Sequence, residues 1–229
     1  MIVQEGCTEI SDKQRGRSVS SPTESTFEKA YVDDRSCFGT RPSMWLKKLP
    51  DEWCGMGGTA VDLGCGHGRN AVYIAQRGMY VLALDLSPAA IRELNELAEA
   101  EGLNITGLCA DIRDYPLPPS RLIVAVTVLS VLTEDELREL SLRLADSLVP
   151  GGILLMEDFT DRDPGSEGSP EASEFAPLIQ HYFQPAEVPG LFPGLRTLTL
   201  REFSTLDTSH GATHRHWIVR YVGRKTRDS

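Results

Sequence analysis

Cysteine is scarce in this sequence, and long apolar runs are absent from it. The cysteines number five, an odd count, and include no Cys-x-x-Cys pair, which excludes a complete disulfide framework and gives no zinc-ligand spacing. No run reaches the roughly 18 apolar residues that a membrane-spanning helix needs, and the first 25 residues lack the apolar core of a signal peptide. We therefore expect a reduced, cytoplasmic protein with no membrane partner.

Basic residues are also in the minority. Lysine and arginine total 23 against 33 aspartates and glutamates, which gives a formal net charge of −10. A chain with this balance has no overall field that attracts a polyanion, so we expect no nucleic-acid partner and a small-molecule substrate. Length and charge leave open whether the protein is a monomer or a homodimer.

The length of 229 residues and the 41% hydrophobic content suit one α/β domain with a sizeable core. Residues 1–25 are polar and predict a disordered extension, so that residues 26–229 form the domain. Apolar runs with strand character alternate with helical periodicity, which is typical of a parallel α/β sheet. We expect strands at 59–63, 80–85, 105–109, 121–132 and 153–156, helices from 71 and at 89–100 and 137–148, and a closing antiparallel pair at 195–203 and 214–222.

The most informative segment is the glycine loop between the first strand and the first helix of the sheet. Its glycines, at 64, 66 and 68, form Gly-x-Gly-x-Gly and not the Gly-x-Gly-x-x-Gly of a dinucleotide site. Glycines here permit positive φ and let ligand atoms approach the backbone closely. Asp62 precedes the loop; its charge opposes a pyrophosphate and suits a cationic ligand. The pattern indicates a site for an adenosine-containing cation.

A second acid lies at the end of the next strand. Asp85 follows Gly64 by 21 positions (85 − 64), and an acid about 20 residues beyond such a loop is placed to accept hydrogen bonds from both ribose hydroxyls. The alternative is that Asp85 caps the helix that begins at Ser87-Pro88. Its spacing from the glycines favours the ribose role.

The segments DLGCGHGRN, ALDLSPAAI, CADIRDYPLP and THRHWIVRYVGRK resemble the class I (Rossmann-like) S-adenosylmethionine-dependent methyltransferases. Within that superfamily the resemblance is greatest to the tellurite-resistance and small-molecule methyltransferases. It implies a Rossmann-like, seven-stranded, mostly parallel sheet with a C-terminal antiparallel hairpin and helices on both faces. It also implies S-adenosyl-L-methionine as cofactor and S-adenosyl-L-homocysteine as product.

The resemblance assigns Asp111 to the adenine amino group and Ile112 to the adenine ring, whereas the alternative for Asp111 is a turn-forming role. Cys65, inside the loop, is expected as a small residue of the motif and not as a reactive thiol. The cofactor-binding residues that we predict are Asp62, Gly64, Cys65, Gly66, Gly68, Asn70, Asp85, Leu86, Asp111, Ile112, Thr127 and Val128.

The acceptor side of the site is less defined. Relatives place substrate-contacting residues after the fourth strand and near the closing strand, which here points to Ser130 and to His214-Arg215-His216. The alternative for the latter is a solvated strand end. Catalytic candidates are His214, Arg215 and Ser130; substrate candidates are Tyr31, Arg41, His181, His214, Arg215 and His216. The spacing of His, Asp and Glu indicates no metal site.

Residues 161–193 form a long connection rich in Pro, Gly, Ser and acids. Its apolar residues Phe175, Leu178, Ile179, Tyr182 and Phe183 follow helical spacing, which predicts an amphipathic helix acting as a lid or substrate wall. The alternative is a surface helix packed on the sheet.

These features together predict methyl transfer from S-adenosylmethionine to a small acceptor. Because no strong general base stands out, we expect a thiol, a chalcogen oxyanion or an ionised oxygen as the attacking group. Two alternatives stay open: a non-catalytic S-adenosylmethionine-binding module and, less favoured by the glycine spacing, a nicotinamide-dependent oxidoreductase.

Overall fold

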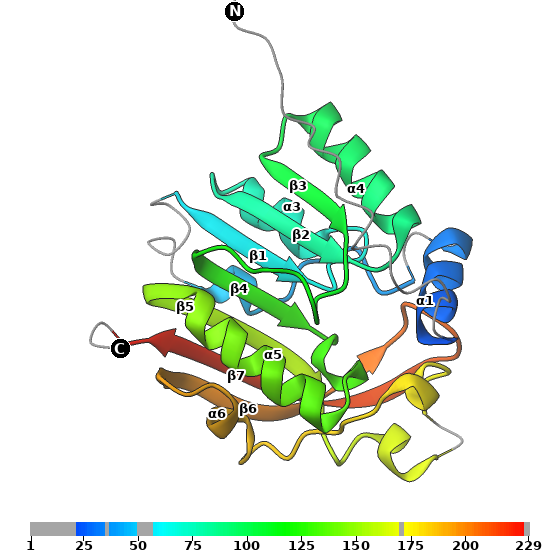
Figure 1. Ribbon diagram of the computed structural model, residues 1–229. Coiled ribbons are helices and arrows are strands. Elements are labelled where there is room, and N and C mark those ends of the chain that lie inside the picture. Colours follow the sequence, from blue (N-terminus) through cyan, green and yellow to red (C-terminus); the bar gives the residue numbers. More distant parts are fainter. Residues whose placement is uncertain (1–21, 35–36, 50–56, 170–171, 227–229) are drawn as a thin grey trace, which may run out of the picture.

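A single seven-stranded sheet forms the centre of the protein (Figure 1). The computed structural model describes residues 22–34, 37–49, 57–169 and 172–226. The strand order is β3-β2-β1-β4-β5-β7-β6; β1 to β5 run parallel, and β7 is antiparallel to both β5 and β6. The strands are β1 Thr59–Leu63, β2 Tyr80–Asp85, β3 Ile105–Cys109, β4 Ser120–Val126, β5 Leu148–Phe159, β6 Leu195–Asp207 and β7 His214–Lys225.

Helices cover both faces of the sheet. Two of them begin at side-chain caps: Ser87 accepts a hydrogen bond at the N-terminus of α4, and Thr133 and Glu136 form a capping box at the N-terminus of α5. The helices are α1 Pro22–Asp33, α3 Arg69–Ala75, α4 Pro88–Glu101, α5 Glu134–Ser147 and α6 Val188–Leu191, with short 3-10 turns at Leu46–Lys48, Leu129–Val131, Pro164–Glu167 and Ala176–Leu178. None of the helices in the described ranges is long and apolar enough to cross a membrane.

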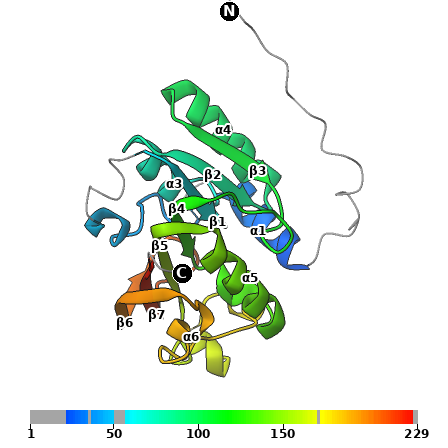
Figure 2. The same ribbon diagram turned by 60° about the vertical axis from the view of Figure 1, so that its left-hand side comes forward.

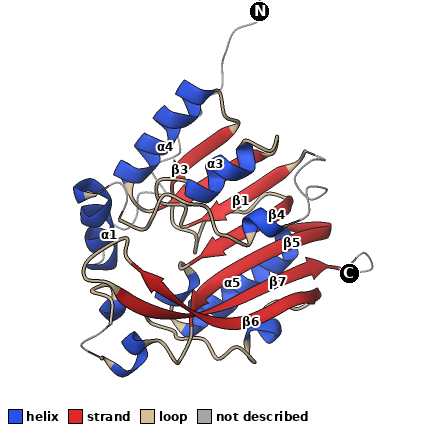
Figure 3. Cartoon of the chain, turned by 180° about the vertical axis from the view of Figure 1, so that it is seen from behind, coloured by secondary structure: helices blue, strands red, loops and turns tan. Residues whose placement is uncertain are grey.

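Side-chain alternation along the strands divides the core into two layers. Val61 and Leu63 of β1 pack with α5 residues, whereas Ala60 packs with residues of α3 and α4. Successive side chains of a strand point to opposite faces, so one continuous apolar strand supplies both layers. Figure 3 shows α3 and α4 on the near face of the sheet and α5 behind it.

The strand order changes direction next to β1. β1 pairs with β2 on one side and with β4 on the other, and the chain leaves these strands toward opposite faces. Open α/β sheets bind ligands in the crevice at the carboxyl ends of the strands flanking such a switch point. Helix α1 lies beyond these carboxyl ends and packs against α4, as Figures 1 and 2 show.

The predicted fold class is confirmed, but several element predictions need correction. The fifth strand, β5, runs over Leu148–Phe159 and not only over 153–156. The fourth strand ends at Val126 and not at 132, because Thr127 has a positive φ of 53° and a 3-10 turn follows. The amphipathic helix predicted over residues 175–183 is wrong: of these residues only Ala176–Leu178 are helical, as a 3-10 turn, and the backbone of Phe183 pairs with the end of β5.

The N-terminal boundary also differs. Residues 22–25, which we expected to be disordered, belong to α1, whereas the remainder of the predicted extension, 1–21, lies outside the described residues.

Replacement of Ile123 tests the central core. Ile123 is fully buried in β4 between Val61 and Leu154, so Ile123→Ala leaves a cavity and should lower the free energy of unfolding by about 2–5 kcal/mol. The matched control is Leu142→Ala on α5, where the side chain is 48% exposed and the change should stay within about 0.5 kcal/mol. Urea denaturation measures both. Equal losses would contradict the placement of β4 at the centre.

Candidate functional site

The glycine loop forms a tight turn from β1 into α3. Gly64, Gly66 and Gly68 have φ values of 60°, 52° and 81°, a region that side-chain-bearing residues rarely adopt. Gly68 is also the N-cap residue of α3. The amide of Cys65 donates to the carbonyl of Leu84 in β2, at 3.0 Å, which ties the loop to the neighbouring strand.

Each of these glycines is approached by a side chain from a different part of the chain. A Cβ at position 64 would lie 2.5 Å from Val128, one at 66 would lie 2.6 Å from the hydroxyl of Tyr31, and one at 68 would lie 2.3 Å from Leu94. Three elements therefore converge on the glycine loop: the segment after β4, helix α1 and helix α4. We predicted that ligand atoms approach these glycines closely. In the structure, side chains of the protein also approach them closely.

Asp62 presents a buried carboxylate oxygen without a partner. The residue is 1% exposed, and its Oδ2 has no hydrogen bond among the described residues. Burial raises the pKa of Asp62 to about 7, although the charge of Arg69 and a backbone hydrogen bond from Ala71 oppose the rise. A desolvated, unpartnered carboxylate is costly to keep, and a ligand cation beside it would remove that cost. These properties fit the methionine end of S-adenosylmethionine.

Asp85 holds the glycine loop in place. Its Oδ2 accepts from the amide of Gly66 at 2.8 Å, and its Oδ1 accepts from the amide of Ser87 at 2.9 Å. Burial raises the pKa of Asp85, and these backbone hydrogen bonds lower it again in part. Each carboxylate oxygen carries a further lone pair, so the residue combines the loop contact with the capacity to accept from ribose hydroxyls.

Helix α1 closes over this end of the loop. Glu28 accepts a hydrogen bond from the Ser87 hydroxyl at the start of α4, and the ring of Tyr31 lies edge-on to His67 at 5.0 Å. Burial, followed by the charge of Asp85, raises the pKa of Tyr31 well above its usual value. Tyr31 therefore stays a neutral phenol in the wall of the site.

The residues predicted to surround adenine lie apart from the cavity. Asp111 accepts from Arg113 Nε, at 2.9 Å to both oxygens, and from Nη2 at 2.6 Å. Arg113 also donates to Glu136. Ile112 is buried in the α5-side core, and Leu86 is 40% exposed. The adenine role of Asp111 stays a prediction, and it would require the carboxylate to be shared with Arg113.

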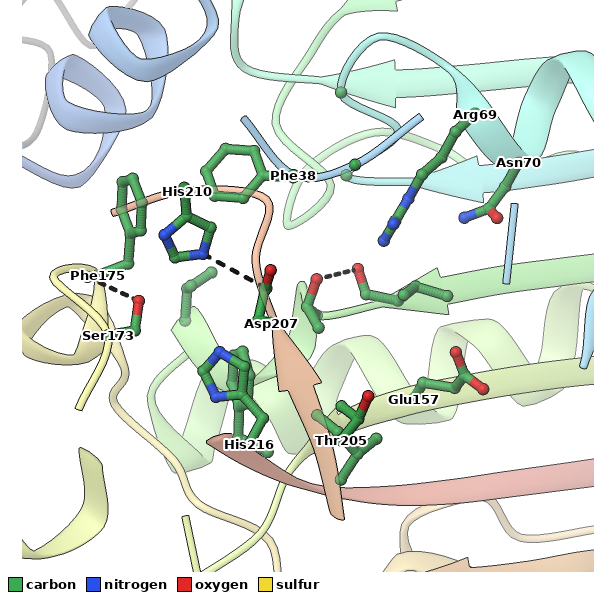
Figure 4. Close-up of a pocket in the computed structure, with 18 of the residues that line it drawn as sticks. Phe38, Arg69, Asn70, Glu157, Ser173, Phe175, Thr205, Asp207, His210 and His216 are labelled. Atoms are coloured by element: carbon green, nitrogen blue, oxygen red, sulfur yellow. Dashed lines mark hydrogen bonds and ion pairs between the residues drawn. The ribbon is translucent and has the colours of Figure 1, made fainter. Parts of the chain in front are cut away.

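A cavity of about 340 Å³ opens beside the glycine loop. Arg69 and Asn70 reach it from α3, Glu157 from β5 and Thr205 from β6 (Figure 4). Asn70 also accepts from the amide of Ser43 at 2.9 Å. The volume falls in the range of about 300–1,000 Å³ that small-molecule sites have.

One wall of the cavity contains a buried ion pair. Arg220 on β7 donates to Glu157 on β5, and both side chains are about nine-tenths buried. The Arg220 guanidinium also lies over the rings of Trp45 and Phe203, with its carbon 4.7 Å and 4.2 Å from their centroids. Glu157 and Arg220 line the cavity as a neutralised pair.

Three phenylalanines join distant segments over the cavity. Phe27 of α1 stacks on Phe175 of the 161–193 segment at 5.7 Å, and Phe38 packs against both at 5.9 Å and 5.0 Å. All three line the cavity, as does Ile179. The 161–193 segment thus contributes an apolar wall, through a turn and the 3-10 helix Ala176–Leu178 and not through an amphipathic α-helix.

A histidine cluster lies next to these phenylalanines, where Phe38 and Phe175 contact His210. Asp207, His210 and His216 line it, and the imidazole of His214 lies against His216 with Nε2 atoms 3.0 Å apart. Desolvation lowers the pKa of His210. Sequence spacing gave no indication of a ligand cluster here, because the β6–β7 turn is what brings position 210 back beside 207 and 216. Asp207 was missed for the same reason.

The remaining predicted residues fall in different places. Thr127 lines the cavity with its strained backbone, and Cys65 lines it as a buried thiol whose pKa burial raises well above its usual value. The structure does not bring Arg41, His181, Arg215 or Ser130 to the cavity. Arg41 is exposed, His181 pairs with Glu187 at 2.7 Å, Arg215 donates to Ser204 on the opposite face of β7, and Ser130 is fully buried beneath β5.

Comparisons with known proteins agree with this geometry. A family profile described as "Methyltransferase domain" matches residues 60–152. The chain is 30% identical over 126 residues to the tRNA N(3)-cytidine methyltransferase METTL2B of Homo sapiens, covering 50% of this chain and 33% of that protein. It is 31% identical over 97 residues to the probable S-adenosyl-L-methionine-dependent methyltransferase TehB of Haemophilus influenzae, covering 42% of this chain and 34% of that protein. The chain thus spans about a third of the length of these relatives.

Solved structures share the fold over most of the chain. The crystal structure of TehB from Haemophilus influenzae has a TM-score of 0.65 at 21% identity and covers 89% of this chain and 67% of its own. A structure concerned with conversion of a disulfide bond into a thioacetal group during echinomycin biosynthesis has a TM-score of 0.64 at 22% identity. The match covers 90% of this chain and 93% of that one.

The matched segment contains the glycine loop, Asp62, Asp85 and the switch point of the sheet. The resemblance stated from the sequence is therefore confirmed: residues 60–152 match a methyltransferase domain, and the chain is similar in sequence and fold to S-adenosylmethionine-dependent methyltransferases such as TehB.

Proposed function

We propose that the chain transfers the methyl group of S-adenosylmethionine to a small-molecule acceptor that binds in the cavity beside the glycine loop. The observation that carries this proposal is the buried Oδ2 of Asp62, which no described residue hydrogen-bonds, behind a loop that Asp85 holds by the Gly66 amide. A cationic, ribose-containing ligand satisfies both carboxylates at once.

Each part of the site has its own role in this proposal. Asp62 balances the positive charge of the methionine end, and Asp85 accepts from the ribose hydroxyls. When bound, the cofactor supplies a methyl group that is already electrophilic. The cavity lies on the β4–β5–β7 side of the loop, so its walls hold the acceptor and exclude water, and most of the rate arises from orientation.

The acceptor that we favour is small and carries an ionised or soft nucleophile. The cavity of about 340 Å³ is closed on one side by phenylalanines and accommodates a compact molecule. Although METTL2B is named for a tRNA substrate, the net charge of −10 disfavours a polyanion here. Thiols, chalcogen oxyanions and ionised oxygens need no strong base and stand first among the acceptors.

The test of this proposal has two stages. Titration calorimetry with S-adenosylmethionine, S-adenosylhomocysteine and NAD should give micromolar binding of the two adenosyl compounds and none of NAD. A panel of thiols, chalcogen oxyanions, phenols and tRNA should then be screened for release of S-adenosylhomocysteine. Binding of NAD alone would overturn the proposal. Tight cofactor binding with turnover of none of the acceptors would instead favour a non-catalytic binding module.

Asp85→Ala tests the ribose contact. Loss of its hydrogen bonds should cost about 1–3 kcal/mol of cofactor binding, which raises the dissociation constant about 5–150-fold. The control is Asp114→Ala, a nearby exposed acid whose removal should leave the constant unchanged. Calorimetry measures both variants, with circular dichroism to verify folding. An unchanged constant in a folded Asp85→Ala protein would remove Asp85 from the site.

Cofactor affinity should depend on pH through Asp62. A cation beside the carboxylate stabilises its ionised form, so binding lowers a pKa that is about 7 in the free protein. Protons are then released on binding below pH 7, and affinity should fall about eightfold as the pH drops from 7.5 to 6. Calorimetry in buffers of different ionisation enthalpy measures the released proton. The Asp62→Asn variant should bind more weakly, without this pH dependence; a persisting dependence would assign it to another group.

Phe175→Ala tests the apolar wall. Loss of this ring opens the cavity on the 161–193 side, so the KM of the acceptor should rise while the dissociation constant of S-adenosylmethionine stays within about twofold. Leu206→Ala, at an exposed position of β6, serves as the control for both constants. An acceptor KM that does not change would show that the wall does not contact the acceptor.

A further inference from the structure

Four metal-ligating side chains meet where β6 turns into β7. One ligand atom from each of Asp207, His210, His214 and His216 lies within 4.8 Å of those of the other three. Asp207 ends β6 and stands directly opposite His214, which begins β7. His216 follows on the same face of β7, and His210 returns from the turn between the strands. The close-up in Figure 4 shows Asp207 between His210 and His216.

The outer nitrogens of two of these histidines are already committed. His216 Nδ1 lies 2.8 Å from Asp163 Oδ2, and His214 Nδ1 lies 2.7 Å from the carbonyl of Ala212. Both oxygens are acceptors, so both Nδ1 atoms carry the hydrogen. In the neutral rings each Nε2 therefore carries a lone pair, and these two lone pairs face each other at 3.0 Å.

Two facing lone pairs need a positive charge beside them. Either one ring takes an additional proton, or a metal ion binds both nitrogens. Two nitrogens bound to one tetrahedral Zn²⁺ at about 2.0–2.1 Å lie about 3.3 Å apart, which is close to the separation found here. Hydrogen bonds from the outer ring nitrogens to a carboxylate and a carbonyl are the arrangement that metal-bound histidines ordinarily have.

The other two side chains also direct atoms to this point. Asp207 Oδ1 accepts from the amide and hydroxyl of Ser209 at 2.7 Å and 2.6 Å. Its Oδ2 lies 3.6 Å from Nε2 of His210, too far for a hydrogen bond. The His210 side chain is 7% exposed; its Nδ1 lies 3.8 Å from Glu174 Oε1 and has no hydrogen bond within the part of the chain that the structure describes.

Aromatic rings shield the cluster. The rings of Phe38 and Phe175 contact His210, with centroids 5.6 Å and 5.0 Å away, and Phe159 lies 4.7 Å from His216. Such a shell keeps water from the ligands and fixes ring orientations. Asp163 is itself buried and accepts from the amide of Trp217 as well, so the carboxylate behind His216 is held in position.

We propose that Asp207, His210, His214 and His216 bind one divalent transition-metal ion of the Zn²⁺ class. Three imidazoles and one carboxylate fill a tetrahedral shell, which is the closed coordination of a structural zinc site. The ion fixes the turn 208–213 against the sheet and so stabilises one wall of the acceptor cavity. This site goes beyond the proposed function, because the cofactor residues of β1 and β2 do not depend on it.

Titration of the full-length, chelator-stripped protein with Zn²⁺, monitored by calorimetry, tests the site. We expect one ion per chain with micromolar or tighter affinity, and a rise in Tm as the ion binds. Co²⁺ serves as a second probe, because tetrahedral coordination gives visible absorption much stronger than that of the hydrated ion. His210→Ala and His214→Ala should each lower the affinity at least tenfold and abolish the tetrahedral spectrum.

The matched control is His181→Ala, which removes a histidine that pairs with Glu187 outside the cluster and should leave the stoichiometry, affinity and spectrum unchanged. Circular dichroism and S-adenosylmethionine binding by the stripped proteins verify that each variant is folded. Absence of saturable Zn²⁺ binding in the wild-type protein, or equal affinity in the His214→Ala variant, would overturn the metal site and assign the short His214–His216 contact to a shared proton. Either result leaves the cofactor titration as a separate test of methyl transfer.

Discussion

The constraint on which the rest of the structure depends is the absence of side-chain atoms at three alternate positions of the β1–α3 loop. Val128 occupies the space above Gly64, Tyr31 that above Gly66, and Leu94 that beside Gly68. A Cβ at any of them would meet one of these side chains at less than 3 Å. The loop after β4, helix α1 and helix α4 can therefore approach the same turn, and their approach sets the shape of the cofactor end of the site.

Charges around this turn are arranged to receive a cation. Asp62 is buried, and its Oδ2 has no partner among the described residues. Asp85 accepts hydrogen bonds from the amides of Gly66, in the glycine loop, and Ser87. On the acceptor side the acid Glu157 is already neutralised by Arg220. Under the proposed function, the negative charge at the glycine loop stabilises the cationic ligand next to β1, and the cavity beyond it is left for a second molecule.

The cavity is assembled from segments that are far apart in the chain. Phe27, Phe38 and Phe175 come from three separate stretches, yet their rings are in contact. The hairpin of β6 and β7 supplies the histidine cluster, and His210 contacts two of these rings. These walls lie outside residues 60–152, the part of the chain that matches the methyltransferase family.

The sequence by itself determined the parallel core, the glycine loop and the two carboxylates at strand ends, because strand alternation, turn chemistry and helix caps are local properties. Only the tertiary structure decided where β4 ends, since Thr127 adopts a positive φ within an otherwise apolar run. It also decided that Phe183 pairs with β5 although its spacing suits a helix. Likewise, Asp207 and His210 join His214 and His216 only because an antiparallel turn folds back on itself. Contacts between residues distant in sequence, and the backbone pairing that competes with local periodicity, leave no periodic signal in the chain.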